Sequence, residues 1–165
     1  MIRTERLLLR KPQIGDDLTE FVGDAEVQRW IGGAGETAAE VIERWVSRWE
    51  RNEIGQFVVD LDGRLIGRVG FIVWDRRTWE TSAYDVAGDH AVTELGWAIL
   101  QRDWGHGYAT EAALAARDWA GLDYLVSLID PANERSIRVA EKLGAMPTER
   151  VETPHTTADV WVHPR

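Results

Sequence analysis

The segment that most constrains this chain is a glycine-bearing loop between a predicted strand and a predicted helix. Val92 to Leu100 (VTELGWAIL) is rich in β-branched and apolar residues and predicts the strand, and the alanine-rich stretch from Gly107 to Ala120 predicts the helix. Gly105 and Gly107 let backbone N–H groups approach a ligand closely, and the helix N-terminus adds partial positive charge. The loop therefore predicts a site for an anion, most naturally a phosphate. A helix start whose glycines serve only tight packing remains the alternative.

Two common nucleotide-binding motifs do not fit this loop. No Gly-Lys-Ser or Gly-Lys-Thr follows it, so it is not a Walker loop. Thr110 stands where the third glycine of a dinucleotide fingerprint belongs, and no βαβ half precedes it. The phosphate would therefore belong to another kind of ligand.

The rest of the pattern predicts one α+β domain over residues 1–165. Strands are expected over 4–10, 56–61, 65–74, 124–129, 147–152 and 159–162, and helices over 16–30, 37–53 and 133–143. Asp62-Gly63 is a strong signal for a tight hairpin turn between two of these strands. The chain shows no internal repeat and no linker composition, which favours a single domain.

Composition excludes several classes of protein. The chain has no cysteine, which excludes a disulfide framework and a cysteine nucleophile and fits a reducing cytoplasm. Its net charge of −9 makes it a poor nucleic-acid binder, because phosphate neutralisation needs clustered Lys and Arg. No apolar stretch approaches membrane-spanning length. We expect a cytoplasmic monomer or homodimer without nucleic-acid or membrane partners.

Three pieces of sequence carry a resemblance when they are taken together. They are TERLLLR at 4–10, ELGWAI and WGHGYATEA within 94–112, and PANERSIRVAEKLGA at 131–145. In this combination the chain resembles the GNAT superfamily of N-acetyltransferases and is similar to its RimJ/RimL-like branch. The resemblance implies a mixed, mostly antiparallel splayed sheet flanked by helices, with acetyl-coenzyme A between the strands at 92–100 and 124–129.

The activity implied by the resemblance is transfer of an acetyl group from acetyl-coenzyme A to a primary amine. The acceptor would be a peptide or protein N-terminus or a small amine, and attack would be direct within a ternary complex. Acetyl-coenzyme A supplies an activated acyl group, so neither a metal ion nor a covalent enzyme nucleophile is required.

The resemblance also assigns a coenzyme site. Its pyrophosphate loop falls on Trp104, Gly105, His106, Gly107, Tyr108, Ala109 and Thr110. Trp104 stands where the family has Gln or Arg; a register shifted to Arg102, Gly105 and Gly107 restores an Arg. The first register is preferred because Tyr108 to Ala112 then opens the helix as in this branch. Asn133 would contact the pantetheine arm, and a backbone N–H near Trp97 or Ala98 would bind the oxyanion.

Glu94 and Ser136 are the predicted catalytic residues. Glu94 should lie beside the thioester, where partial burial would raise its pKa and make it a general base; a strand carboxylate facing solvent or an arginine is the alternative. His90 and Tyr84 are weaker candidates. Ser136 is the best remaining hydroxyl for the thiolate, although Asn133 and Ser136 could simply form the first turn of a helix.

Two departures from the family pattern leave other functions open. The late-helix tyrosine that many members use as general acid is replaced by Ala140, and the residue after Gly144, usually aromatic, is Ala145. An acyl-coenzyme A-binding sensor or scaffold with little or no turnover is therefore an alternative. A longer acyl donor, such as succinyl, is another.

The connection at 76–90 predicts how an acceptor would be attracted. Four acidic residues lie in or beside it: Asp75, Glu80, Asp85 and Asp89. An acidic rim there would steer a protonated amine inward; solvated loop charges are the alternative. Trp74 and Trp79 flank the connection and are candidates for lining the acceptor cleft.

Overall fold

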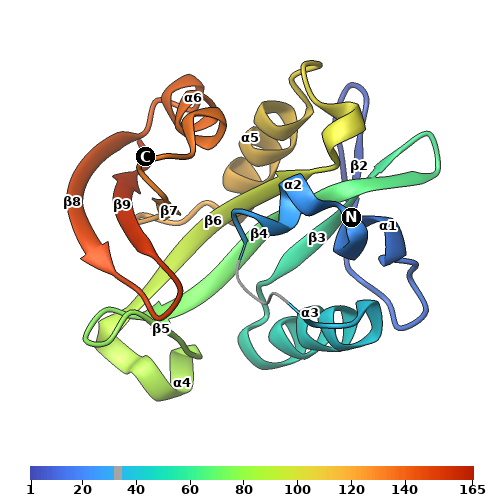
Figure 1. Ribbon diagram of the computed structural model, residues 1–165. Helices are drawn as coiled ribbons and strands as arrows, with labels where there is room; N and C mark the ends of the chain where they lie inside the picture. The colour runs from blue at the N-terminus through green and yellow to red at the C-terminus, as the bar shows by residue number, and fades with distance from the viewer. Residues whose placement is uncertain (32–34) are drawn as a thin grey trace.

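One mixed sheet organises the computed structural model, which describes residues 1–31 and 35–165 (Figure 1). The strands are β1 (Ile2–Arg3), β2 (Leu8–Arg10), β3 (Gln56–Leu61), β4 (Arg64–Asp75), β5 (Glu80–Thr81), β6 (Ala91–Ile99), β7 (Val126–Ile129), β8 (Met146–Glu152) and β9 (Thr157–Val162). The helices are α1 (Thr19–Gly23), α2 (Ala25–Gln28), α3 (Ala38–Asn52), α4 (Tyr84–Ala87), α5 (Tyr108–Ala120) and α6 (Glu134–Lys142), with short 3₁₀ turns η1 (Gly88–His90) and η2 (Gln101–Asp103).

The sheet confirms the expected mixed, mostly antiparallel α+β architecture. Its order is β1-β2-β3-β4-β6-β7-β9-β8, with β5 added beside β4. Every neighbouring pair is antiparallel except β6 and β7. Across the described residues, every helix is too short or too polar to cross a membrane.

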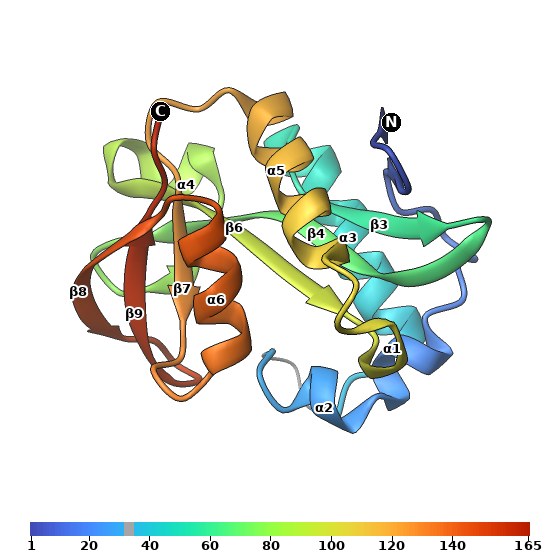
Figure 2. The ribbon, with the colours of Figure 1, turned by 90° about the horizontal axis from the view of Figure 1, so that it is seen from above.

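The parallel strands β6 and β7 are paired at one position. β4 and β6 stay paired from Gly67↔Ile99 to Asp75↔Ala91, whereas β6 and β7 share the single pair Glu94↔Val126. Beyond it the strands diverge, with α5 lying over β6 and α6 over β7 (Figure 2). The sheet is therefore splayed, as expected.

Helices cover the two faces of the central strands. Ala112, Ala113 and Ala116 of α5 are fully buried against one face, together with strand residues such as Leu95. α1, α2 and α3 pack on the other face, where Trp45 of α3 is buried. Small side chains on α5 allow the helix to approach the sheet closely, which fixes the loop at its N-terminus near the end of β6.

Short sequence signals at the ends of helices and in the hairpin turn correctly predicted several element boundaries. Thr37 forms a capping box with Glu40, with both reciprocal bonds present, and α3 begins at the next residue. Asp62 and Gly63 both have positive φ, 51° and 80°, as a tight β3–β4 hairpin requires. Gly144, at φ 76°, follows the end of α6.

The predicted helix over 16–30 is wrong in its continuity. Asp24 has extended backbone (φ −79°, ψ 103°), and its carboxylate accepts the N–H groups of Glu26 and Val27. An aspartate in that position begins a new helix, so the segment divides into α1 and α2. Of the strand expected over 4–10, only β2 is formed, and β1 precedes that range; the 76–90 connection contains β5 and α4.

A buried histidine bonds to the serine that connects β7 to β6 where the two strands diverge. The Ser127 hydroxyl donates its single proton to the Leu95 carbonyl (2.6 Å). In its bond with His163 Nε2 (2.8 Å) Ser127 Oγ is therefore the acceptor, which assigns the proton of the imidazole to Nε2. The Nδ1 atom of His163 is buried and has no partner among the described residues. Burial, helped by the charge of Arg117, lowers the pKa of His163 to about 4.

We expect His163 to make the fold acid-sensitive. Because the folded pKa of about 4 lies below the ordinary 6.5, the unfolded chain binds more protons between these values, and stability is lost as the pH falls. His163 should account for a loss of up to about 3 kcal/mol. Urea unfolding of wild type and His163→Gln at pH 7 and 4.5 measures this loss. The exposed His155→Gln variant is the control; a pH dependence identical in all three chains would contradict the assignment.

Candidate functional site

A cavity of about 210 Å³ opens where β6 and β7 part. Its walls include Val27, Trp30 and Ile31 in and after α2, Arg68, Ile72 and Trp74 of β4, residues 94–99 of β6, residues 127–130 of and after β7, Asn133 and Ser136 at the start of α6, and Thr153 and His155 of the β8–β9 turn. The cavity thus reaches both sides of the parted strands.

Glu94 lines this cavity and is only 9% exposed. Its Oε2 accepts the indole N–H of Trp74 at 2.6 Å. Burial raises the pKa of Glu94 above its usual range, against the opposing effects of that hydrogen bond, the charge of Arg68 and the backbone amide of Leu128. A carboxyl group with a raised pKa, facing a cavity, is suited to accept a proton near neutral pH.

The residues predicted to contact the coenzyme fall into two groups. Those that line the cavity are Trp97, Ala98, Trp104, Ala109, Asn133 and Ser136. Those that form the loop and first turn of α5 outside its walls are Gly105, His106, Gly107, Tyr108 and Thr110. The indole N–H of Trp104 donates to the Ile99 carbonyl (2.8 Å), and Arg135 of α6 stacks on its ring at 3.6 Å. Trp104 thereby links the loop to both β6 and α6.

The N-terminus of α5 lacks a side-chain cap. Gly107 precedes the helix at φ 79°, and the first backbone bond runs from the Glu111 N–H to the Gly107 carbonyl. The N–H groups of Tyr108, Ala109 and Thr110 therefore have no intrahelical acceptor. Such a helix start can bind an anion through its backbone.

The amino-terminal segment holds this loop in place, which the sequence did not reveal. Glu111 accepts bonds from the Thr4 hydroxyl (2.6 Å), the Arg6 backbone N–H (2.9 Å) and the Arg6 Nε (2.7 Å). Arg6 also donates to the His106 carbonyl at 2.9 Å. The carboxylate of Glu111 is thus neutralised by Arg6 instead of opposing an anion at the helix start.

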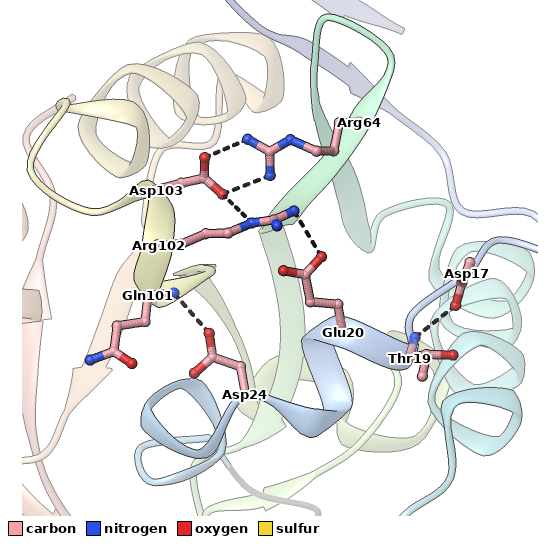
Figure 3. A network of polar contacts seen from close by, with 8 residues as sticks. All are labelled: Asp17, Thr19, Glu20, Asp24, Arg64, Gln101, Arg102 and Asp103. Carbon is pink, nitrogen blue, oxygen red and sulfur yellow. Dashed lines mark hydrogen bonds and ion pairs between the residues drawn. The ribbon is translucent and has the colours of Figure 1, made fainter.

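A second network ties η2, just before the loop, to α1 and α2 (Figure 3). The Gln101 N–H donates to the Asp24 carboxylate at 2.8 Å, and Arg102 pairs with Glu20 at 2.9 Å. Asp103 is buried and accepts two bonds from Arg64 of β4 (2.6 and 2.9 Å). The α2 wall of the cavity and the glycine loop are therefore fixed to each other.

The α6 residues combine a structural role with a place at the cavity. Asn133 caps α6, because its Oδ1 accepts the Ser136 N–H at 3.2 Å. Ala140 and Ala145 are fully buried, and the indole of Trp161 from β9 packs with them. The two positions that are aromatic in the family pattern are thus small residues packed with Trp161.

The predicted acidic rim is wrong. None of its four residues lines the cavity: Asp75, Glu80, Asp85 and Asp89. Asp75 bonds to Arg77 at 2.6 Å, and Asp85 pairs with Arg51 at 3.4 Å. Asp75 and Asp85 are thus held by neighbouring arginines, and all four carboxylates lie outside the cavity walls.

The weaker candidates also lie elsewhere. The Tyr84 hydroxyl is within 2.6 Å of Thr93 Oγ1, and neither Tyr84 nor His90 lines the cavity. Trp74 lines it as expected, whereas Trp79 does not. Sequence reasoning missed Arg68 and Ser127, which both line the cavity, because only the register between strands places them there.

Comparison with known proteins agrees with this geometry. The model of the acetyltransferase (GNAT) domain matches residues 6–146. The Bacillus subtilis protein YkkB is 33% identical over 153 residues, which cover 86% of this chain and 82% of that protein. The crystal structure of an acetyltransferase from Agrobacterium tumefaciens has a TM-score of 0.77 and 28% identity, with 99% of this chain and 94% of the other covered.

A further structure shares the fold at lower identity. The aminoglycoside acetyltransferase AAC(6′)-Ib in complex with coenzyme A and kanamycin has a TM-score of 0.75 and 22% identity, with 96% of this chain and 95% of the other covered. With the family model matching most of its length, the chain belongs to the GNAT family of acetyl-coenzyme A-dependent N-acetyltransferases.

Proposed function

We propose that this chain transfers the acetyl group of acetyl-coenzyme A directly to a primary amine within a ternary complex. The observation that carries the proposal is the buried Glu94 carboxyl, which lines the cavity at the only residue pair recorded between β6 and β7 in the described chain. The acceptor would be a peptide or protein N-terminus or a small amine. Membership of the RimJ/RimL-like branch, a monomeric or homodimeric state and a cytoplasmic location stay predictions.

The coenzyme would bind across the parting of the strands. Its pantetheine arm would lie along the edge of β6 near Trp97 and Ala98, beyond the last pair with β7. Its pyrophosphate would accept the backbone N–H groups at the start of α5. The Nδ2 group of Asn133 would contact the arm, since its Oδ1 is already bonded to the Ser136 N–H.

The acceptor amine would lose a proton to Glu94, directly or through water, and its nitrogen would attack the thioester carbonyl carbon. A backbone N–H near Trp97 or Ala98 would stabilise the oxyanion of the tetrahedral intermediate. The C–S bond would then break, with the Ser136 hydroxyl as the proposed donor to the departing thiolate. These steps need proximity and proton transfer only.

Ala140 supports a second candidate function. With alanine buried at this position, the site lacks the phenol that many relatives offer to the thiolate. A protein that binds acyl-coenzyme A and turns over slowly or not at all is therefore the alternative, as is an enzyme for a longer acyl donor. Thiol release from acetyl- and succinyl-coenzyme A over a panel of amines decides between them. A thiol reagent reports only free coenzyme A here, because the chain has no cysteine.

Gly107→Glu should weaken coenzyme A binding at least about tenfold, because a carboxylate would stand beside the proposed pyrophosphate site. Gly107→Ala is the matched control: at φ 79° both variants carry the same backbone strain, of about 1 kcal/mol, and only one carries the charge. Titration calorimetry with coenzyme A measures both. Equal affinities for the two variants would place the pyrophosphate elsewhere.

Glu94→Gln should lower the rate constant for acetyl transfer by about a hundredfold and leave the Michaelis constant for acetyl-coenzyme A unchanged. Because burial raises the pKa of Glu94, the acidic limb of the wild-type pH–rate profile should lie above the range of an ordinary glutamate, and the variant should lack this limb. The exposed Glu80→Gln variant is the control. Full activity of Glu94→Gln at every pH would show that the amine loses its proton to solvent.

A further inference from the structure

The cavity contains a buried arginine whose Nη1 atom bonds to no described residue. Arg68 of β4 lines the cavity and is only 9% exposed. Its Nη1 atom is fully buried and has no hydrogen-bond partner within residues 1–31 and 35–165. Burying an unpaired charge is costly unless hydrogen bonds and an opposite charge compensate. A guanidinium that is left in this state at a cavity wall points to a ligand with an anionic group.

Arg68 lies close to Glu94 without pairing with it. The register Arg68↔Ala98, Gly70↔Gly96 and Ile72↔Glu94 puts both side chains on the same face of the sheet. Arg68 Nη1 and Glu94 Oε1 are 3.1 Å and 3.8 Å from the position that a Cβ on Gly96 would occupy, and so are at most 6.9 Å apart. The absence of a side chain at Gly96 keeps the space between the two charges open.

Helix α3 makes this side of the cavity more positive. Arg48 donates to the Gln56 side chain at 3.1 Å, and burial lowers the pKa of Arg48 to about 10. The pKa of Arg68 is likewise lowered by burial to about 10, so both guanidinium groups remain charged at neutral pH. Arg44 is paired with Glu36 and therefore adds no net charge.

We propose that the acceptor is a small amine with a carboxylate on or next to the carbon that bears its amino group, that the carboxylate binds Arg68, and that the amine faces Glu94. The inference rests on the proposed transfer to an amine and narrows its acceptor. Because Arg68 Nη1 and Glu94 Oε1 are at most 6.9 Å apart, a ligand that bonds to both must carry its amine and its anionic group close together. A guanidinium binds a carboxylate with two parallel bonds, which gives both affinity and orientation. Polyamines and aminoglycosides lack such a group and would leave Arg68 buried and unpaired.

The test compares amines that differ only in this charge. Thiol release from acetyl-coenzyme A is measured with the protein amino acids other than cysteine and proline, the amide of each, spermidine and kanamycin. We expect kcat/KM for at least one amino acid to exceed that of its amide by about a hundredfold. Arg68→Met, which retains the apolar stem, should remove this preference by raising the KM for the amino acid more than the KM for its amide, whereas any change in the pKa of Glu94 would affect both acceptors alike. Arg150→Met, which removes a surface arginine outside the cavity, should behave as wild type.

Each alternative result has a definite meaning. Equal rates with amino acid and amide, or turnover of spermidine or kanamycin alone, would overturn the role of Arg68 and leave the proposed transferase function standing. If coenzyme A binds but no amine releases thiol, the transferase function itself fails, and the acceptor inference fails with it. If Arg68→Met does not fold, the comparison of amino acids with their amides in wild type decides alone.

Discussion

The site depends on a single interruption of backbone pairing. Parallel neighbours in a sheet continue their ladder as far as both strands run, but β6 and β7 share only Glu94↔Val126 before they diverge. Backbone N–H and C=O groups that lose a ladder partner need another. Ser127 supplies one by donating to the Leu95 carbonyl. In the proposed complex, the amide groups of the pantetheine arm would take the place of β7 as partners of the groups farther along β6.

The walls on the two sides of this interruption are not independent. Asp24 begins α2 and also accepts the N–H of Gln101, while Arg64 of β4 binds the buried Asp103. The α2 wall of the cavity and the entry to the glycine loop are therefore held by the same contacts (Figure 3). At the other end of the loop, Glu111 is held by Thr4 and Arg6 of the amino-terminal segment. Elements distant in the sequence thus fix the cavity wall and the glycine loop relative to each other.

The features that could be predicted from the sequence are those that depend on interactions between residues close together in the chain. The capping box at Thr37 and the turn at Asp62-Gly63 act within a few residues, so they were readable. The break at Asp24 was readable in principle as an N-cap, but the apolar pattern around it favoured one helix. Arg68 was not: RLIGRVGF reads as a strand, and only the register with β6 places that residue beside Glu94. The acidic rim failed because Asp75 and Asp85 have arginine partners that a charge pattern does not identify.

The packing of Trp161 against Ala140 and Ala145 affects which sequences the family can pass through. A tyrosine introduced at 140 alone would add a ring to space that is already filled, and such overpacking costs on the order of 1–3 kcal/mol. Loss of the indole alone, by truncation to alanine, would leave a void lined by small residues and cost about 3–5 kcal/mol. The two arrangements are therefore separated by intermediates that are both less stable, and a lineage that moves between them has to change positions on β9 and α6 together. Epistasis of this kind would disfavour the replacement of Ala140 by tyrosine through a single substitution.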